Sequence, residues 1–174
     1  MKLAVFSDIH DNFHNLRLAL SEMRRRNISR AYCLGDFINP GIVKQIIDSG
    51  IVVFAVWGNN DGEKSIIAKM SCESQGIFQI ADTTFSSAEV DGRRIFLSHH
   101  PDFAGSIAKS GDYDAVFYGH NHKEHFERLG NGCILANPGE ISSHITDRST
   151  FLIWDTVSNL IEQIELEDIV RVNS

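Results

Sequence analysis

Polar side chains of the types that bind metal ions follow five short apolar runs, at the point where each run ends. In an extended segment residues i and i+2 point to the same side, so Asp8 and His10 form one candidate pair. His120 and His122 form another. The remaining clusters are Asp36, Asn59 with Asp61, and His99 with His100. One such cluster alone would indicate a solvated loop, but α/β folds place their sites beyond strand ends, so the recurrence predicts one shared site.

Seven of these side chains form a ligand set of two carboxylates, four imidazoles and one amide: Asp8, Asp36, His10, His99, His120, His122 and Asn59. Mixed nitrogen and oxygen ligands favour Mn, Fe, Zn, Co or Ni over Ca, which prefers oxygen alone. Seven ligands exceed one tetrahedral site and suit two divalent ions that share a carboxylate. Two ions about 3.5–4 Å apart generate a hydroxide at neutral pH and clamp phosphoryl oxygens, so the set predicts hydrolysis of an anionic phosphate ester.

The elements that must hold these residues begin with an alternation of strands and helices. Apolar runs predict strands over Leu3–Phe6, Ala31–Leu34 and Ile51–Val56. Apolar residues at helical spacing between Phe13 and Met23 predict a helix that ends in the basic run Arg24–Arg26. A shorter helix is predicted over Ile42–Ile47 and closed by Gly50. This alternation favours a parallel sheet with helices packed on it.

The second half of the chain changes to hairpins. Three are predicted: Thr84–Val90 with Arg93–Ser98, His125–Leu129 with Cys133–Ala136, and Phe151–Asp155 with Leu160–Leu166. The first has a tight Asp91-Gly92 turn, and a separate strand is predicted over Ala115–Tyr118. Hairpins after strand–helix units favour an α/β fold with a mixed sheet, or with two sheets packed face to face and helices outside.

The composition limits the classes of protein to which the chain can belong. With 174 residues, of which 43% are hydrophobic, the chain suits a single domain over 1–174 with a substantial core. A net charge of −7 argues against binding of nucleic acid through bulk charge. No apolar run approaches the ~20 residues that cross a bilayer, so no membrane partner is expected. Cys33, Cys72 and Cys133 are widely spaced, which predicts reduced thiols and a cytoplasmic location.

Five motifs occur in a specific order: Asp8-Ile9-His10, Gly35-Asp36, Gly58-Asn59-Asn60-Asp61, Ser98-His99 and Gly119-His120-Asn121-His122. In this order they resemble the calcineurin-like metallophosphoesterases, and among these the small bacterial and archaeal phosphodiesterases. The resemblance runs from Lys2 to Gly139 and includes the turn Asn137-Pro138-Gly139. It implies a four-layer αββα sandwich of two mixed β-sheets flanked by helices. It also implies a hydrolase, a metal-dependent phosphodiesterase that acts on a small phosphate ester.

The resemblance implies a role for each ligand. One divalent ion would be held by Asp8, His10 and His122, the other by Asn59, His99 and His120, with Asp36 bridging the two. A hydroxide bridging the ions would attack phosphorus in line with the leaving oxygen. Manganese is the expected metal, with Ni, Co, Fe and Zn as alternatives. Asp61 would steady the Asn59 loop without touching a metal ion.

Three residues depart from the usual pattern of the family. Asn60 stands at a catalytic position where many members have a His that assists the leaving group; its amide donates a hydrogen bond but is no general acid at neutral pH. His100 replaces a Gly and is interpreted as an exposed loop residue, with a proton donor as the alternative. Glu140 replaces a small polar residue, and its direction is left open. No insertion is long enough for a cap, so specificity is expected from short loops or from a second subunit of a homo-oligomer.

Other interpretations explain fewer of these residues. The main alternative is a non-catalytic, metal-binding scaffold for protein interactions with the same fold, as one retromer subunit is, yet all seven ligand positions are filled here. The run His120–His125 is close to the HxHxDH pattern of metallo-β-lactamase-like hydrolases. That pattern leaves four residues unexplained: Asp8, His10, Asp36 and Asn59. His125 is therefore expected on a strand face. A nuclease is disfavoured by the acidic balance.

Overall fold

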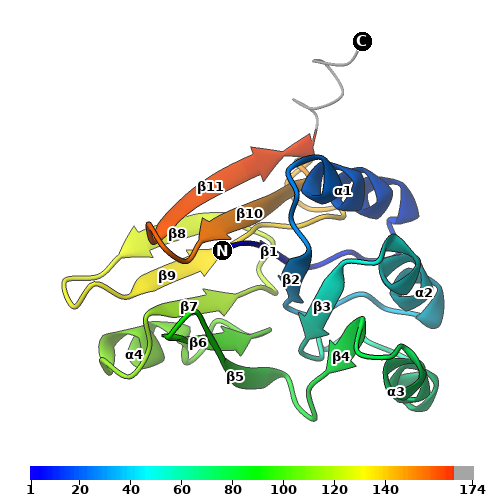
Figure 1. Ribbon diagram of the computed structural model, residues 1–174, viewed down its shortest axis with the longest axis horizontal. Helices are drawn as coiled ribbons and strands as arrows, with labels where there is room; N and C mark the ends of the chain where they lie inside the picture. Colours follow the sequence, from blue (N-terminus) through cyan, green and yellow to red (C-terminus); the bar gives the residue numbers. More distant parts are fainter. Residues whose placement is uncertain (167–174) are drawn as a thin grey trace.

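The computed structural model of the chain describes residues 1–166 and contains, within them, two β-sheets that lie face to face (Figure 1). The first sheet has the strand order β11-β10-β1-β2-β3-β4. Its strands are β11 (Leu160–Glu165), β10 (Thr150–Asp155), β1 (Lys2–Phe6), β2 (Arg30–Cys33), β3 (Val52–Ala55) and β4 (Phe78–Ile80). Strands β1 to β4 are parallel, and β10 is antiparallel to both of its neighbours. The domain predicted over 1–174 includes residues 167–174, which lie outside the described residues.

The second sheet has the strand order β5-β6-β7-β9-β8. Its strands are β5 (Phe85–Val90), β6 (Arg93–Ser98), β7 (Ala115–Tyr118), β9 (Ile134–Asn137) and β8 (His125–Arg128). Strands β6, β7 and β9 are parallel, whereas β5 and β8 are antiparallel to their neighbours. Both sheets therefore mix parallel and antiparallel pairs, and all three predicted hairpins are present.

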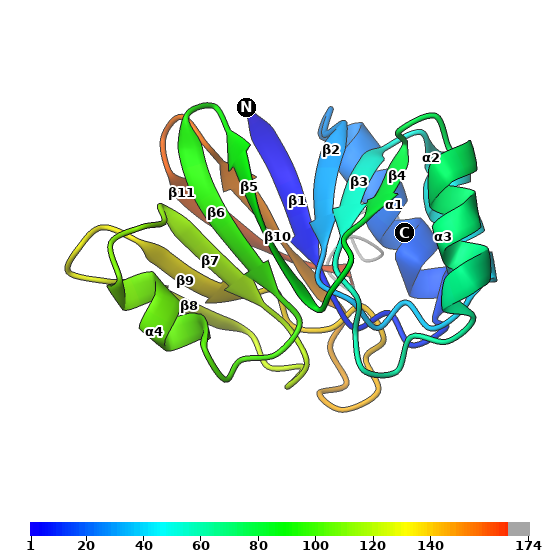
Figure 2. The ribbon, with the colours of Figure 1, turned by 90° about the horizontal axis from the view of Figure 1, so that it is seen from below.

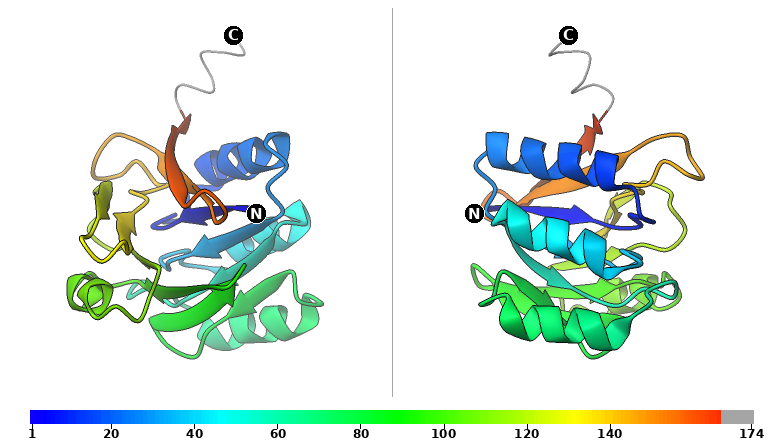
Figure 3. Two further views of the ribbon diagram at one scale, coloured as in Figure 1. Left: turned by 60° about the vertical axis from the view of Figure 1, so that its left-hand side comes forward. Right: turned by 90° about the vertical axis from the view of Figure 1, so that its right-hand side faces the viewer.

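Helices cover the outer face of each sheet, so the fold has four layers (Figure 2). α1 (Phe13–Arg25), α2 (Pro40–Ser49) and α3 (Lys64–Glu73) lie side by side on the first sheet (Figure 3), and α4 (Ala104–Lys109) lies on the second. This arrangement confirms the αββα sandwich that the order of the motifs implies. Within residues 1–166, no helix is long and apolar enough to cross a membrane.

Apolar side chains that alternate along the strands fill the space between the sheets. Leu3 and Val5 of β1 lie in this layer with Phe117 and Trp154, whose ring centroids are 5.5 Å apart. Phe6 of β1 belongs instead to the core between the first sheet and its helices. Strand β1 is thus buried on both faces, as its unbroken apolar run predicts.

Asparagine side chains begin the first two helices and bring their N-termini close to the loops that follow β1 and β2. The Asn12 side chain accepts a hydrogen bond from the Asn15 N–H and caps α1. Asn39 caps α2 in the same way, and Gly50 ends that helix at φ 72°, the left-handed conformation that glycine adopts readily. The helix predicted over Ile42–Ile47 is therefore longer than expected, because Asn39 caps its start and Gly50 ends it.

The loops that follow the parallel strands of both sheets meet at one edge of the molecule, the lower edge in Figure 2. Within the first sheet, the Asp8 N–H donates to Gly35 O at 3.1 Å. Within the second, the Gly119 N–H donates to His99 O at 3.0 Å. The two sets are joined because the His120 N–H donates to Asp8 Oδ2 at 3.0 Å. All five predicted motifs lie on these loops, apart from Ser98, which is the last residue of β6.

Candidate metal centre

Asp8 lies in the middle of a first group of ligating side chains, just beyond the end of β1. Its carboxylate is buried, and its Oδ1 atom lies 3.8 Å from His10 Nε2 and 3.6 Å from His122 Nε2. The two imidazole rings stack with their centroids 4.9 Å apart. One carboxylate oxygen and two ring nitrogens at this spacing can hold a metal ion.

A second group forms around His99, beyond the end of β6. His99 Nε2 lies 2.8 Å from Asn59 Oδ1 and 3.3 Å from His120 Nδ1. The His99 ring is fully buried, and this burial lowers its pKa. Its imidazole is therefore neutral near pH 7, which is the form that binds a metal ion.

Asp36, beyond the end of β2, lies between the two groups. Its Oδ2 atom is 3.4 Å from His10 Nε2 and 3.6 Å from His99 Nε2. The carboxylate is buried and reaches one nitrogen of each group. In this position Asp36 can serve as a ligand in either group.

Two buried atoms of the first group have no hydrogen-bond partner among residues 1–166, namely Asp8 Oδ1 and His10 Nε2. Burial of such atoms without a partner costs free energy, and native structures seldom leave them so. Because the two atoms lie 3.8 Å apart, one divalent ion would satisfy both at once. The side chains present therefore fit a bound metal ion.

Acceptors behind two of the rings determine which ring nitrogen is free. His99 Nδ1 lies 2.7 Å from Leu34 O, so Nδ1 carries the proton and Nε2 keeps its lone pair. His122 Nδ1 lies 2.7 Å from Glu140 Oε2, which leaves its Nε2 for the first group. Burial opposes ionisation of Glu140, yet hydrogen bonds from His122 and Ser142 outweigh it and lower the pKa of Glu140.

Five of the seven predicted ligands have positive φ: Asp8 at 53°, His10 at 44°, Asp36 at 54°, His120 at 73° and His122 at 62°. Residues other than glycine adopt this left-handed conformation at a cost in free energy. Such strain persists only where the surrounding contacts hold it, and it concentrates at functional sites. The backbone of the centre is therefore held in place by its neighbours.

The loops after β2 and β3 pack so closely that position 58 accepts only glycine. A Cβ atom at Gly58 would lie 2.0 Å from Asp36 Oδ1. Asp61 ties the same loops together, because its carboxylate accepts from the Gly58 N–H at 2.6 Å and from the Ile38 N–H at 2.8 Å. Both oxygens of Asp61 are thus engaged by the backbone, and the residue supports the loop that carries Asn59.

Asn60, the residue predicted at the catalytic position, contacts the shared carboxylate. Its side-chain Nδ2 donates to Asp36 Oδ2 at 2.8 Å, and its backbone N–H donates to Asp36 Oδ1 at 2.9 Å. Asn60 is exposed, whereas Asp36 is buried. The amide therefore lies at the mouth of the centre and orients Asp36.

The expectation that His100 is an exposed loop residue is wrong. Its ring is half-buried, with its centroid 4.9 Å from that of His99 and 4.7 Å from that of His120. The Ser98 hydroxyl donates to His100 O at 2.8 Å and holds the turn. A ring nitrogen of His100 is close enough to those of His99 and His120 to complete a further ligand group.

Sequence reasoning missed two residues beside the centre. It left the direction of Glu140 open, because the burial of this side chain, which requires polar partners, is evident only from the structure. His144 also lies beside the centre: its side chain is exposed, and its ring centroid lies 6.1 Å from that of His10. His125, by contrast, lies on β8 as expected, with Nδ1 2.9 Å from the Tyr118 hydroxyl, and belongs to none of the ligand groups.

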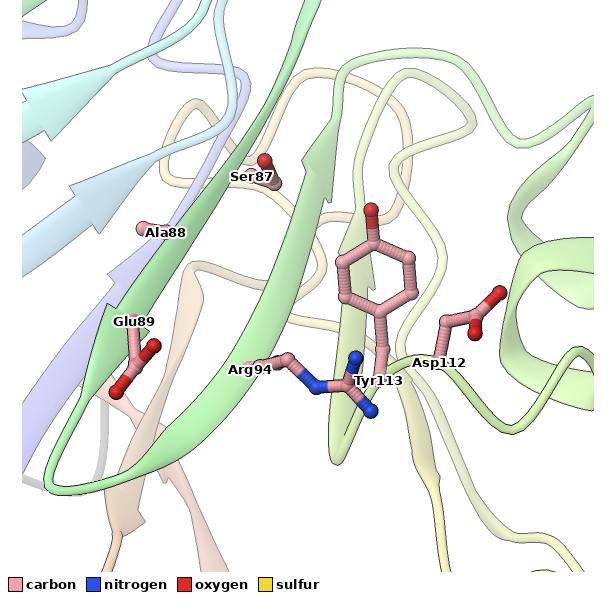
Figure 4. A pocket seen from close by; sticks show the side chains of 6 residues that line it. All are labelled: Ser87, Ala88, Glu89, Arg94, Asp112 and Tyr113. Carbon is pink, nitrogen blue, oxygen red and sulfur yellow. The ribbon is translucent and has the colours of Figure 1, made fainter.

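A hollow of about 460 Å³ lies away from the centre, beside β5 and β6 of the second sheet (Figure 4). It is lined by Ser87, Ala88, Glu89, Arg94, Asp112 and Tyr113. None of these residues is a predicted ligand, and the lining mixes both signs of charge. This hollow is therefore separate from the ligand-bearing loops.

Comparisons with known proteins match nearly the whole of the chain. The family model described as the calcineurin-like phosphoesterase superfamily domain matches residues 1–159. Phosphodiesterase MJ0936 of Methanocaldococcus jannaschii is 32% identical over 169 residues, which cover 96% of this chain and 100% of that protein. The solved structure of an archaeal phosphodiesterase has a TM-score of 0.87 at 31% identity and covers 95% of this chain and 99% of that one. Yfce, a phosphoesterase from E. coli, shares the fold with a TM-score of 0.65 at 20% identity, over 95% of this chain and 100% of its own.

Proposed function

Because the chain belongs to the calcineurin-like phosphoesterase superfamily, we propose that it hydrolyses phosphodiesters with the help of two divalent metal ions. Membership makes the chain a phosphoesterase, that is, a metal-dependent hydrolase of phosphoric esters. The diester substrate, the number of ions and their identity are the proposed parts. The 32% identity to a protein named a phosphodiesterase, over nearly the whole of both chains, supports the diester.

One observation carries the proposal of a metal centre. Asp8 Oδ1 and His10 Nε2 are buried and have no hydrogen-bond partner among the described residues, and Asp36 Oδ2 lies 3.4 Å from the same ring nitrogen. The second group, around His99, shares Asp36 at 3.6 Å. Two ligand groups on one carboxylate support two ions rather than one.

Two ions bound in this way would lower the pKa of a water molecule to supply a hydroxide, and would neutralise charge on the phosphoryl oxygens. The protein's own contribution is orientation: Asp36 spans both groups, and His99 and His122 keep their protons on Nδ1. We propose manganese, with nickel, cobalt, iron and zinc as alternatives, because mixed imidazole and carboxylate ligands suit these ions.

Asn60 sets the expected class of ester. An amide has no proton to give to a leaving oxygen at neutral pH, so the leaving group must depart with little protonation. Esters with stable leaving groups meet this condition, and aryl phosphodiesters are the simplest of them. Alkyl monoesters are expected to be poor substrates.

Metal removal and reconstitution test the proposal. The chain is stripped with a chelator, and its metal content is measured by elemental analysis beside its rate on bis-p-nitrophenyl phosphate. We expect activity to vanish and to return with Mn²⁺, Ni²⁺ or Co²⁺ better than with Mg²⁺, at two ions per chain. Full activity of a chain that holds no metal would refute the proposal.

The same measurement separates the alternative function. A non-catalytic scaffold of this fold would bind the ions and turn over no ester, whereas a phosphodiesterase does both. Three further statements stay predictions: the cytoplasmic location, the homo-oligomer and the absence of nucleic-acid binding. They rest on cysteine spacing, the short loops around the centre and the net charge of −7.

A further inference from the structure

Glu140 is a fully buried carboxylate at the start of the loop between β9 and β10. Its Oε1 atom accepts from the Ile145 N–H at 2.9 Å and from the Thr146 N–H at 2.7 Å. The Thr146 hydroxyl donates to the same atom at 2.8 Å. We call residues 142–146 the 142–146 segment. One oxygen of Glu140 thus accepts three hydrogen bonds from the C-terminal part of this segment.

The other oxygen of Glu140 contacts both the segment and His122, a predicted metal ligand. Oε2 accepts from the His144 N–H at 3.0 Å and from the Ser142 hydroxyl. The same atom lies 2.7 Å from Nδ1 of His122. A single carboxylate therefore joins five groups of the segment to one imidazole of the first ligand group.

The 142–146 segment borders the centre. The Ser142 N–H donates to Asp8 O at 3.0 Å, and the Asn12 side chain donates to Ser142 O at 3.0 Å. The His144 ring lies 6.1 Å from that of His10, and Ile145 next to it is 64% exposed. Figure 2 shows this loop, in orange, extending beyond the edge where the ligand-bearing loops meet. An ester bound at the centre would meet the exposed side of the segment.

We propose that Glu140 is a positioning residue that couples the order of the 142–146 segment to metal binding through His122. An ion on Nε2 of His122 requires the ring proton to stay on Nδ1, where Glu140 accepts it. A bound ion therefore holds Glu140 in the position that the segment needs, and by linkage an ordered segment strengthens metal binding. That the segment touches an ester rests on the proposed function; the coupling itself does not.

Hydrogen exchange on the full chain tests the coupling without any turnover. The amides of His144, Ile145 and Thr146 are followed in the metal-free chain and in the chain saturated with Mn²⁺. We expect slower exchange with Mn²⁺. In Glu140→Gln we expect this metal-dependent slowing to disappear and the dissociation constant of Mn²⁺ to rise about 10–100-fold, as for loss of other partners of metal-binding imidazoles.

Two further variants keep the test decisive. Thr146→Val removes one hydrogen bond from Oε1 and leaves the His122 contact, so it serves if Glu140→Gln fails to fold. We expect faster exchange of the segment and Mn²⁺ binding weakened about two- to tenfold, the range that one hydrogen bond supports. Glu22→Gln changes a buried glutamate far along α1 from the centre and should leave Mn²⁺ affinity unchanged.

Two results would overturn the proposal. One is identical exchange of the three amides with and without Mn²⁺ in the unaltered chain. The other is a Thr146→Val chain whose segment exchanges faster while its Mn²⁺ affinity stays the same, because Glu140 would then be a structural anchor only. Kinetics on bis-p-nitrophenyl phosphate test separately whether the segment contacts the ester. If it does, Thr146→Val should raise KM more than it lowers kcat. Intact coupling in a chain that hydrolyses no ester would refute the proposed function alone.

Discussion

At the scale of single residues, the centre depends on Asp36, the carboxylate that both ligand groups share. Its Oδ2 atom lies within 3.6 Å of ring nitrogens from His10 and His99, and the Asn60 amide donates to it. A neutral amide at position 36 would keep the shape but lose the negative charge that two divalent ions need between them. The shared carboxylate is therefore the most sensitive position of the site.

We expect Asp36→Asn to lower kcat/KM on an aryl diester by at least about 100-fold, the upper end of what loss of an outer-shell partner causes. His125→Ala is the matched control, because His125 contacts Tyr118 and belongs to none of the ligand groups. Steady-state kinetics and metal content are measured on both variants. Equal losses in the two would mean that the ligand assignment is wrong.

Asn60 supports a second prediction at this scale. Asn60→His restores a proton donor at the mouth of the centre, and general acid catalysis contributes about 10²–10⁴-fold where a donor is well placed. The ratio of kcat/KM for an alkyl monoester to that for an aryl diester should therefore rise in the variant. A ratio that stays constant in a chain still holding both ions would place Asn60 outside the path of the leaving group. His100→Ala would then be the next variant to measure.

At the scale of elements, sequence patterns predict correctly those strands and helices that bury one whole face or both faces. β1, α1 and the three hairpins have clear apolar periods. α3, β4 and α4 lack them and were not predicted: α3 buries Ile67 alone, its N-cap Glu63 makes no capping hydrogen bond, and α4 has six residues. Tertiary packing, which a local pattern does not contain, decides such short elements.

The candidate site also has features that the sequence predicts and features that depend on tertiary packing. The order of the five motifs predicts which loops meet, because parallel strands end at one edge. The positive φ of Asp8 and His122 and the contacts of Glu140 follow from loop packing between the two sheets, which residue spacing does not encode. His100 was misjudged for this reason: its burial depends on the rings of His99 and His120, which come from two different loops.

The C-terminal end of α1 offers a prediction about stability. Glu22 is buried and lies 2.6 Å from Arg25 Nη2 and 2.5 Å from Arg26 Nε, and Arg26 also pairs with Glu162 of β11 at 2.7 Å. The hydrogen bond from Arg25 is the main cause that lowers the pKa of Glu22 below 4.5. Because the folded state favours the ionised carboxyl, its contribution is full above the ordinary pKa and is lost as the pH falls through the lowered one.

Glu22→Gln should therefore lower the free energy of unfolding by about 1.5 kcal/mol at pH 7, the lower end for hydrogen bonds to charged groups. The difference from the unaltered chain should narrow as the pH falls below 4.5. Urea unfolding at several pH values measures both quantities. A difference independent of pH would mean that the lost packing of the side chain, and not its charge, causes the effect.

At the scale of the whole molecule, the centre joins the two sheets. Asp8 and Asp36 follow strands of the first sheet, and His99, His120 and His122 follow strands of the second. An ion held by residues from both sheets binds the folded chain and not the unfolded one, so it stabilises the entire sandwich. Metal binding should therefore be visible in global unfolding.

For each ion that binds, we expect Mn²⁺ at 100 times its dissociation constant to add about 2.7 kcal/mol and to raise Tm by roughly 5–10 °C in a chain of this size. The shift is measured by calorimetry on stripped and reloaded chains. His125→Ala should keep the full shift, whereas Asp36→Asn should lose most of it. An equal shift in Asp36→Asn would show that the stabilising ion binds elsewhere.

The pairing of β1 with β10 joins the two ends of the described chain, since Leu3 lies opposite Trp154 and Val5 opposite Leu152. During synthesis on the ribosome, β2 can pair with one edge of β1 early. The other edge of β1 stays unpaired until β10 has been made. Partners so far apart in sequence make folding slow, and an open strand edge invites association with other chains meanwhile. All seven predicted ligands are synthesised before residue 123, yet the Ser142 contact to Asp8 forms only when most of the chain has emerged. The complete set of contacts around the centre can therefore form only near the end of chain synthesis, well after all seven ligands have been made.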